Sequence, residues 1–310
     1  MVFGASGFVG SAAVAALRER GADSIAVPTP RFNPVSAADA KSAARDAMTA
    51  HGSLLGVLAG ADAVINAAGL SDATSSNEGA LIAANAAVPG FIAGLCSQAA
   101  VARFVHVSSA AVQGDRAVLD DGPTGVVMSP YSRSKSLGEE LVRQLGQGRA
   151  VVYRPPGVHA ASRAVTRSLA RLAGSPLAAV ASPGNDPTPQ SLLPNVADAI
   201  AFLALHGRQP SPTVAHPWEG LTTGELLDLL GGRRARRLPR CLARSVVAFG
   251  GALGRTSPRM VAHSRRLEVL WFGQSQAESW LTRQGWRPPV GIEGWAHLGR
   301  ELRRRNSGPT

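Results

Sequence analysis

The sequence predicts an α/β fold: a Rossmann-type doubly wound parallel sheet with a smaller C-terminal substrate-binding lobe. In the first half of the 310-residue chain, short apolar runs alternate with alanine-rich helical stretches, and a glycine-rich turn at Gly4–Gly10 opens the series. Strands that alternate with helices form right-handed βαβ units, which assemble into a parallel sheet. We expect residues 1–155 to form the dinucleotide-binding sheet domain, residues 190–215 to return to it, and residues 156–310 to form mainly the lobe.

Short runs rich in β-branched and other apolar residues predict the strands, and longer alanine- and leucine-rich stretches predict the helices. The expected strands are Val2–Phe3, Ser24–Val27, Ala61–Asn66, Arg103–Ser108 and Arg149–Tyr153. The expected helices are Phe8–Arg20, Gly79–Ala100, Tyr131–Leu145, Val196–Leu205, Thr222–Leu230 and Glu293–Arg304. A central strand usually has about five residues, whereas little of the chain precedes Gly4. We therefore expect the native chain to begin upstream of Met1; the alternative is an unusually short first strand.

The composition favours a globular protein of a reducing compartment. Hydrophobic residues make up 45% of the chain, too many for a disordered one. The two cysteines, Cys96 and Cys241, are too few for a disulfide framework or a four-thiolate metal site. The seven histidines show no metal-ligand spacing, so we expect no metal site, and we also expect no membrane-spanning segment. These features predict a cytoplasmic protein.

The positive charge is concentrated in the last quarter of the chain. The formal net charge is +11; residues 231–310 contribute +12 and the first 230 residues −1. The basic cluster Arg233–Arg240 lacks interleaved aromatic residues and matches no nucleic-acid-binding module, so we expect no nucleic-acid partner. A further interpretation, also disfavoured, is that basic residues around the apolar stretch 241–254 associate with a membrane surface.

Gly4, Gly7 and Gly10 form a G-x-x-G-x-x-G turn between the first strand and the first helix. The first glycine permits the tight turn, the second lets the backbone approach a pyrophosphate, and the third lets the helix pack closely on the strand. The N–H groups at the helix N-terminus then face the diphosphate. The turn therefore predicts a dinucleotide site that includes Gly4, Ser6, Gly7, Phe8 and Val9.

The end of the second strand favours NADP over NAD. Chains that bind NAD usually carry Asp or Glu there, where the carboxylate binds the ribose 2′-hydroxyl. The segment Val27–Arg31 contains no carboxylate. Arg31 has the charge and geometry to bind a 2′-phosphate instead. We therefore expect NADP as the cofactor, with NAD as the alternative.

Tyr131 and Lys135 are four residues apart, on one face of a predicted helix. The chain has only two tyrosines and two lysines, so chance would give about 0.01 such pairs. A lysine ammonium near a phenol favours the phenolate and lowers its pKa, so the tyrosine can exchange a proton with a substrate oxygen. Ser109, at the carboxyl end of a strand, can hydrogen-bond the same oxygen. The alternative is a surface Tyr–Lys contact and a turn-forming serine.

With Asn66–Gly69, Val107–Gly114 and Tyr153–Val158, these motifs follow the order and spacing of a known family. The chain resembles the extended short-chain dehydrogenases/reductases, which are NAD-dependent epimerase/dehydratase-like enzymes of nucleotide-sugar metabolism. The resemblance implies that Ser109 and Tyr131 are catalytic, with Tyr131 as the acid/base and Lys135 as its partner.

The resemblance extends over roughly residues 1–200 and implies further contacts. Additional cofactor contacts are expected at Ala67, Ala68, Gly69, Asn85, Pro155 and Val158, and Asn85 also matches the position that supports the active-site helix. Substrate contacts are expected at Ser109 and Ala110. The resemblance also implies that the basic last quarter covers the substrate, where Arg265 or Arg266 would bind its diphosphate. His159 is a further expected substrate contact because it follows the fifth strand and its proline-rich turn. The resemblance also implies a homodimer, formed through helices near residues 85–100 and 131–147.

One departure from the family pattern narrows the expected reaction. Dehydratases of this family have Asp-Glu directly after the catalytic Ser or Thr, whereas this chain has Ala110-Ala111, so we expect no dehydration. The leading hypothesis is an oxidoreductase that reduces a keto group of a nucleotide-activated sugar by hydride transfer. The alternative is a nucleotide-sugar epimerase with tightly bound NAD. A non-catalytic dinucleotide-binding regulator is disfavoured because Ser109, Tyr131 and Lys135 are all present.

Overall fold

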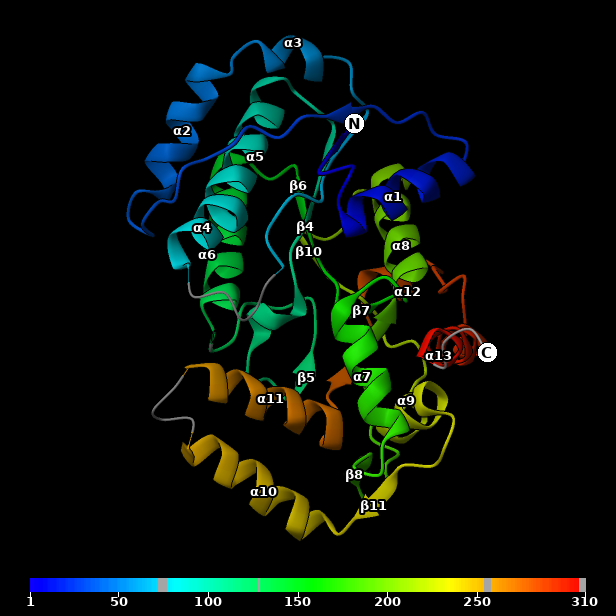
Figure 1. The fold of residues 1–310 in the computed structure, drawn as a ribbon. Helices are drawn as coiled ribbons and strands as arrows, with labels where there is room; N and C mark the ends of the chain where they lie inside the picture. The colour runs from blue at the N-terminus through cyan, green and yellow to red at the C-terminus, as the bar shows by residue number, and fades with distance from the viewer. Residues whose placement is uncertain (72–76, 128, 254–257, 307–310) are drawn as a thin grey trace.

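The fold is described from a computed structural model that covers residues 1–71, 77–127, 129–253 and 258–306. Its centre is a parallel sheet of six strands with helices on both faces, and a second group of helices and short strands adjoins one end of the sheet (Figure 1). This arrangement confirms the predicted fold class.

The central sheet has the strand order β10-β6-β4-β3-β1-β2, and all neighbouring strands are parallel. Its strands are β1 (Val2–Phe3), β2 (Ala26–Val27), β3 (Ala63–Asn66), β4 (Arg103–Val107), β6 (Ala150–Arg154) and β10 (Thr213–Ala215). The chain runs outward from β1 to β2 and then returns past β1 to β3. The strand order therefore reverses between β1 and β3, and open α/β sheets bind ligands outside the carboxyl ends of the strands at such a point.

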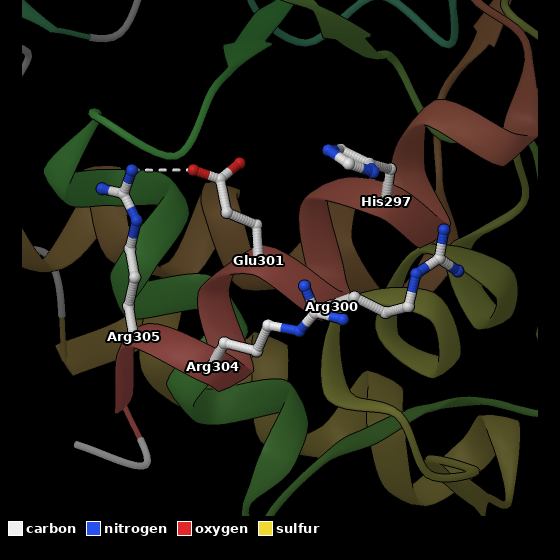
Figure 2. Close-up of a pocket in the computed structure, with 5 residues that line it drawn as sticks. All are labelled: His297, Arg300, Glu301, Arg304 and Arg305. Atoms are coloured by element: carbon white, nitrogen blue, oxygen red, sulfur yellow. Dashed lines mark hydrogen bonds and ion pairs between the residues drawn. The ribbon is translucent and has the colours of Figure 1, made fainter. Parts of the chain in front are cut away.

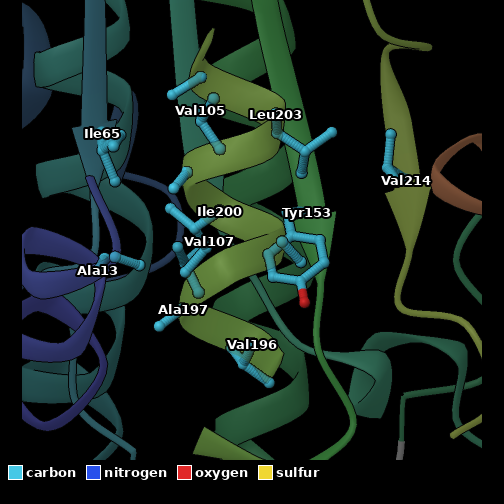
Figure 3. Close-up of a cluster of buried hydrophobic side chains, with 14 of the residues drawn as sticks. Ala13, Ile65, Val105, Val107, Tyr153, Val196, Ala197, Ile200, Leu203 and Val214 are labelled. Atoms are coloured by element: carbon cyan, nitrogen blue, oxygen red, sulfur yellow. The ribbon is translucent and has the colours of Figure 1, made fainter. Parts of the chain in front are cut away.

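Two layers of helices cover the sheet. On one face lie α1 (Phe8–Glu19) and α8 (Leu193–Leu205); on the other lie α2 (Ala40–Ala50), α3 (Leu54–Leu58), α5 (Val88–Gln98) and α6 (Pro130–Leu145) (Figure 1). Successive side chains of a strand point alternately toward the two layers. Val105 and Val107 of β4 pack against Ile200 and Leu203 of α8 (Figure 3), whereas Phe104 belongs to the cluster on the opposite face. Each fully buried side chain of this kind stabilises the fold by about 1.5–3 kcal/mol.

Most predicted elements occur with boundary shifts of a few residues. The second strand begins two residues later than predicted, at Ala26 in place of Ser24. It ends at Val27 as predicted, because Pro28 follows directly and proline has no N–H to donate to the ladder. The helix expected from Val196 begins at Leu193, because Pro194 fits in its first turn.

A continuous helical segment, Glu78–Gln98, crosses the core between α2 and α6. It consists of α4 (Glu78–Ile82), the π-helix η1 (Ala83–Ala87) and α5. Contrary to the expectation from sequence, this segment is long and apolar enough for a membrane span, the one helix of the described residues that is. However, 83% of its most apolar 18-residue stretch is buried inside the fold. Its apolarity is therefore that of a core helix.

A second hydrophobic core lies in the C-terminal part of the chain, where α7 (Ala164–Gly174), α9 (Thr223–Gly231) and α13 (Ile292–Asn306) pack around Trp295. Three two-stranded parallel sheets adjoin it: β7 (Gly157–His159) with β9 (Gln190–Leu192), β8 (Ala179–Ala181) with β11 (Arg236–Leu238), and β5 (Val118–Leu119) with β12 (Ser275–Gln276). The remaining helices are α10 (Arg240–Leu253), α11 (Pro258–Phe272) and α12 (Trp280–Arg283).

The chain beyond residue 155 contributes to both cores. β10 pairs with β6, and α8 packs on α1, so residues 193–215 are part of the sheet domain. Trp280 and Trp286 also join the cluster beneath α8. The C-terminal segment is therefore attached to the sheet domain at several places along its length.

Candidate active site

The glycine turn after β1 lies tightly against the end of β3. Gly4 has φ +75°, a backbone conformation that favours glycine, and a Cβ added there would lie 2.5 Å from the backbone nitrogen of Ala68. A Cβ at Gly10 would overlap the Gly4 carbonyl oxygen. A Cβ at Gly7 would meet only that oxygen, at 3.2 Å. Gly4 and Gly10 are therefore packing positions, and Gly7 is the least crowded of the three.

No side chain caps the N-terminus of α1. Its N-cap residue is Gly7, and no acidic residue lies in the first turn. The first-turn N–H groups and the positive end of the helix dipole thus remain for an external anion. This arrangement fits the diphosphate of a dinucleotide. Of the other residues predicted for this site, Ser6 is exposed, and Phe8 and Val9 are partly buried.

The segment Ala67–Gly69 lies beside the glycine turn, directly after the carboxyl end of β3. Asn85 holds the following residue. Its Oδ1 accepts a hydrogen bond from the Leu70 N–H at 3.0 Å, and its Nδ2 donates to the Leu70 carbonyl at 3.0 Å and to the Ser134 hydroxyl at 3.1 Å. Asn85 is fully buried, so the structure places it behind this strand end as a link to α6.

Asn85 lies in the π-helix η1, and single π-helical turns are often found at functional sites. Gly138 of α6 packs directly on this turn: a Cβ at Gly138 would overlap the Asn85 carbonyl oxygen. The close approach of the two helices therefore depends on Gly138, and it brings the Asn85 side chain within reach of Ser134.

Ser109 follows the end of β4 and begins the 3₁₀-helix η2 (Ala110–Gln113). Its Oγ accepts a hydrogen bond from the Ala111 N–H at 3.2 Å. The Ser109 side chain also lies near enough to Tyr131 to act on the pKa of its phenol. The predicted catalytic serine and tyrosine are thus neighbours.

α6 begins with a capping box that fixes its first turn. The Ser129 hydroxyl accepts a hydrogen bond from the Ser132 N–H at 3.1 Å, and the Ser132 hydroxyl accepts one from the Ser129 N–H at 3.0 Å. Tyr131 lies in this turn and Lys135 one turn later. The Lys135 ammonium donates to the carbonyl oxygen of Val107, the last residue of β4, at 3.2 Å. Tyr131 and Lys135 therefore meet Ser109 at the carboxyl end of β4.

The pKa of Tyr131 is raised, contrary to the expectation that the lysine lowers it. Burial disfavours the phenolate and is the largest effect, while the nearby Ser109 side chain and the charge of Arg163 act in the opposite direction. Burial also lowers the pKa of Lys135 to about 8, and Glu139 opposes this shift. Tyr131 is therefore protonated at neutral pH and able to donate a proton.

Arg163 is a site residue that the sequence reasoning missed. Its guanidinium lies 4.9 Å from the centroid of the Phe8 ring, and its Nη1 donates to the Val158 carbonyl at 3.0 Å. Its charge also lowers the pKa of Tyr131. Arg163 thus connects the glycine turn, the segment after β6 and the catalytic tyrosine. No spacing signals this role, because the fold alone brings these segments together.

A buried ion pair behind the site was also missed. Glu139 is one turn beyond Lys135 on α6 and accepts hydrogen bonds from Arg154 of β6 and from the Ser108 hydroxyl at 2.7 Å. Burial alone would raise the pKa of Glu139, but Arg154 and, to a smaller extent, Ser108 and Arg143 lower it. The i, i+4 spacing from Lys135 to Glu139 is a sequence signal that indicates their common helix face.

The other predicted site residues occupy varied positions. Arg31 is exposed in the loop after β2, Pro155 and Val158 are buried after β6, and Ala110 is partly buried beside Ser109.

His159 is a core residue: its ring nitrogens are hydrogen-bonded to Thr166 at 3.0 Å and Gln190 at 2.8 Å, and burial lowers its pKa to about 4. This position does not favour the predicted substrate contact, because both ring nitrogens are already bonded.

Arg265 and Arg266, the predicted diphosphate ligands, lie on α11. Arg265 donates to Glu268 at 2.7 Å and to the carbonyl oxygen of Gly114 at 3.1 Å, so it packs on the segment that follows Ser109. Arg266 is exposed. The structure thus brings Arg265, but not Arg266, into contact with the chain around the site.

A surface pocket of about 490 Å³ lies elsewhere, on α13 (Figure 2). Its lining residues are His297, Arg300, Glu301, Arg304 and Arg305, none of which is a predicted site residue. Glu301 is paired with Arg305 at 2.7 Å. In the part of the chain that the structure describes, no group of three or more His, Cys, Asp or Glu side chains could hold a metal ion.

The family model for the NAD-dependent epimerase/dehydratase family matches residues 1–183, more than half of the chain. The chain belongs to this family. The match spans the glycine turn, Ser109, Tyr131 and Lys135, and it confirms both the resemblance to extended short-chain dehydrogenases/reductases and the expectation of an NAD(P)-dependent enzyme. No curated protein matches the chain.

Several solved structures share the fold over nearly the whole chain. The UDP-glucuronic acid 4-epimerase from Bacillus cereus in complex with NAD is 16% identical, with a TM-score of 0.64 and coverage of 100% of this chain and 97% of that one. MoeE5 in complex with UDP-glucose and NAD is 17% identical, with a TM-score of 0.63 and 99% of each chain covered. The dTDP-4-dehydrorhamnose reductase from Bacillus anthracis in complex with NADP is 14% identical, with a TM-score of 0.58 and coverage of 97% and 96%.

Proposed function

We propose that this family member is an NADP-preferring reductase that acts on a keto group of a nucleotide-activated sugar. The observation that carries the proposal is the meeting of Ser109, Tyr131 and Lys135 at the carboxyl end of β4. A tyrosine whose pKa is raised holds its proton at neutral pH, and carbonyl reduction requires a proton donor at the substrate oxygen.

The residues around the glycine turn fit a dinucleotide. The uncapped N-terminus of α1 would hold the diphosphate, Ala67–Gly69 would line the strand end beside it, and Lys135 would bind ribose hydroxyls. Arg31 is exposed after β2 without an ion pair among the described residues, which leaves its guanidinium for a 2′-phosphate. When bound, the cofactor supplies a hydride for the carbonyl carbon.

Side chains of the protein then orient and protonate the carbonyl oxygen of the substrate. The Ser109 hydroxyl, which lies near Tyr131, hydrogen-bonds the carbonyl oxygen and orients it. The Tyr131 hydroxyl donates its proton to this oxygen as negative charge develops there. The phenolate left on Tyr131 is stabilised by the nearby charge of Arg163 and by the Lys135 ammonium, which Val107 holds in place.

The residues after Ser109 argue for reduction over dehydration. Ala110 and Ala111 begin η2 and have no acid or base with which to remove a proton from the carbon next to the keto group. The proposed substrate class rests on the fold relatives, whose structures hold UDP-glucose or UDP-glucuronic acid, or carry the name of a dTDP-sugar reductase.

The test is a turnover assay with purified protein, NADPH and a dTDP-4-keto-6-deoxy sugar or a UDP-4-keto sugar. Stoichiometric oxidation of NADPH and formation of the 4-hydroxy nucleotide sugar are expected, with slower turnover when NADH replaces NADPH. The Tyr131→Phe variant is the negative control. Absence of net NADPH oxidation with every keto sugar, under conditions where the protein is folded and binds NADPH, would overturn the proposal.

An epimerase is the second candidate, favoured by the fold match to the UDP-glucuronic acid 4-epimerase with NAD. Such an enzyme would use the same residues to oxidise and re-reduce one carbon, so it would retain its cofactor through turnover. It would purify with bound nicotinamide and interconvert UDP-hexoses without net consumption of added NADPH. Mass spectrometry of the denatured protein's supernatant distinguishes the two candidates.

A further inference from the structure

α10 is the outermost helix at one end of the molecule, with α11 between it and the sheet (Figure 1). It packs on α11 through a single face. Ala243 is fully buried there, and the Val247 carbonyl accepts a hydrogen bond from the Ser264 hydroxyl of α11 at 3.1 Å. Arg240 fixes the start of the helix through an ion pair with Asp186 at 3.0 Å. α10 is therefore attached to the fold with a defined inner face.

The outer face of α10 is apolar and exposed. Leu242, Val246 and Phe249 are 50%, 42% and 69% exposed, and their spacing of four and three residues aligns them in one stripe. None of them belongs to a hydrophobic cluster of the described residues. Single exposed apolar residues are common on protein surfaces, whereas an aligned group on an outer helix indicates a contact surface.

The chain around this stripe is strongly basic. Residues 231–267 contain ten arginines and no acidic residue. Two of the arginines that flank the start of α10 pair with acidic side chains from elsewhere in the fold. Three others are exposed and form no ion pair among the described residues: Arg233, Arg234 and Arg236. They lie in and just before β11, which leads directly into α10. The surface therefore complements a partner that is both apolar and anionic.

We propose that α10 docks on a lipid bilayer with anionic headgroups. Leu242, Val246 and Phe249 enter the interface between headgroups and acyl chains, while the arginines before the helix bind headgroup phosphates. A second copy of this chain would bring the same positive charge to the contact and be repelled. A nucleic acid would match the charge but leave the apolar stripe exposed to water.

The docking helix is connected to the candidate active site through one packed helix. α11 lies against α10, and its Arg265 donates to the Gly114 carbonyl at 3.1 Å, in the segment that begins at Ser109. Docking through α10 therefore gives the site a fixed orientation relative to the membrane surface.

The test is co-sedimentation of the full chain with vesicles at low ionic strength. Two compositions are compared: phosphatidylcholine alone, and phosphatidylcholine with about one third phosphatidylglycerol. We expect binding to the anionic vesicles, weaker binding at high salt, and little binding to the neutral ones. The L242S/V246S/F249S variant is expected to bind at least about tenfold more weakly, and neutralising each of Arg233, Arg234 and Arg236 with Gln should weaken binding about fivefold.

Ile25→Ser is the matched control, because Ile25 is 58% exposed and directly precedes β2 in the sheet domain, away from α10. It should bind like the wild type, and circular dichroism should show that all variants are folded. The proposal is overturned if the wild type stays in the supernatant with anionic vesicles, or if the triple serine variant sediments as the wild type does. It is also overturned if, without vesicles, the wild type is a dimer that the triple variant converts to monomers, because a second copy would then cover the stripe.

Discussion

Arg154 and Glu139 form a bidentate ion pair in the interior of the sheet domain, with Nε–Oε1 and Nη2–Oε2 distances of 2.9 and 2.6 Å. Neither side chain is exposed to solvent. The pair joins β6 to the helix that carries Tyr131 and Lys135. It therefore holds the catalytic face of α6 at a fixed position relative to the carboxyl ends of the strands.

Glu139→Gln removes the charge that compensates the buried Arg154 guanidinium. Breaking a buried pair from one side costs about 3–5 kcal/mol, and we expect a loss of this size in the free energy of unfolding measured by urea denaturation. Glu140→Gln is the matched control: Glu140 is the exposed neighbour, so its change should remain within about 0.5 kcal/mol. Equal losses for the two variants would contradict a stabilising role for the pair.

Tyr131→Phe removes the proposed proton donor. We expect kcat to fall about 10²–10⁴-fold, with the dissociation constant of NADPH and the melting temperature little changed. Tyr153→Phe is the control, because Tyr153 is the other tyrosine of the chain and its buried hydroxyl is bonded to His216 at 2.5 Å. That variant should lose stability and retain kcat. A Tyr131→Phe enzyme with near wild-type kcat would exclude the tyrosine as acid.

The activity is expected to fall as the pH rises through about 8. Lys135, whose pKa is lowered to about 8, loses its positive charge there, while Tyr131, whose pKa is raised, keeps its proton. The alkaline limb of kcat/KM should therefore report the lysine. In Lys135→Arg, whose guanidinium stays charged, this limb should move beyond the pH range in which the protein is folded. If the alkaline limb of the kcat/KM profile were unchanged in the variant, it would report the titration of another group.

Gly7→Ala should weaken dinucleotide binding with little loss of stability. The added Cβ meets only the Gly4 carbonyl oxygen, at 3.2 Å, but it stands at the N-cap of α1, where the diphosphate is proposed to bind. We expect the dissociation constant of NADPH to rise at least about tenfold, measured by fluorescence titration. Gly56→Ala, on α3, adds a Cβ that meets nothing within 4 Å, so this variant should leave the dissociation constant of NADPH unchanged. Equal affinities would place the diphosphate elsewhere.

Arg31→Ala tests the preference for NADP. Loss of a charge-assisted bond to the 2′-phosphate costs about 1.5–3 kcal/mol, so the dissociation constant of NADPH should rise about 10–100-fold while that of NADH stays constant. Arg18→Ala, at an exposed position in the last turn of α1, is the control and should alter neither constant. If Arg31→Ala weakened the binding of NADPH and NADH equally, the arginine would not bind the 2′-phosphate.

The sequence predicted the features that depend on local patterns. The glycine turn, the β-branched strand at Arg103–Val107 and the Tyr131–Lys135 spacing each signal their own structure, and the sheet brings them together at one edge because parallel strands share their carboxyl ends. The sequence could not indicate contacts that exist only in the assembled fold. Arg163 contacts Phe8, which is distant in the sequence, and Arg154 meets Glu139 between a strand and a helix.

Two expectations differed from the structure for physical reasons. Both ring nitrogens of His159 are hydrogen-bonded, to Thr166 and Gln190, and no sequence pattern near the histidine predicts these bonds. The pKa of Tyr131 is set first by burial rather than by charge, and burial at the start of α6 depends on packing from other segments.

The π-helix at Ala83–Ala87 makes the site sensitive to the number of residues as well as to their identity. A helix with one residue fewer at this point would return to regular α geometry, and everything before it would rotate by about 100° relative to α5. Asn85 would then turn away from Leu70 and Ser134, both of which it now bonds. Exchanges among small residues in this turn should be tolerated, whereas a single deletion should separate the end of β3 from α6.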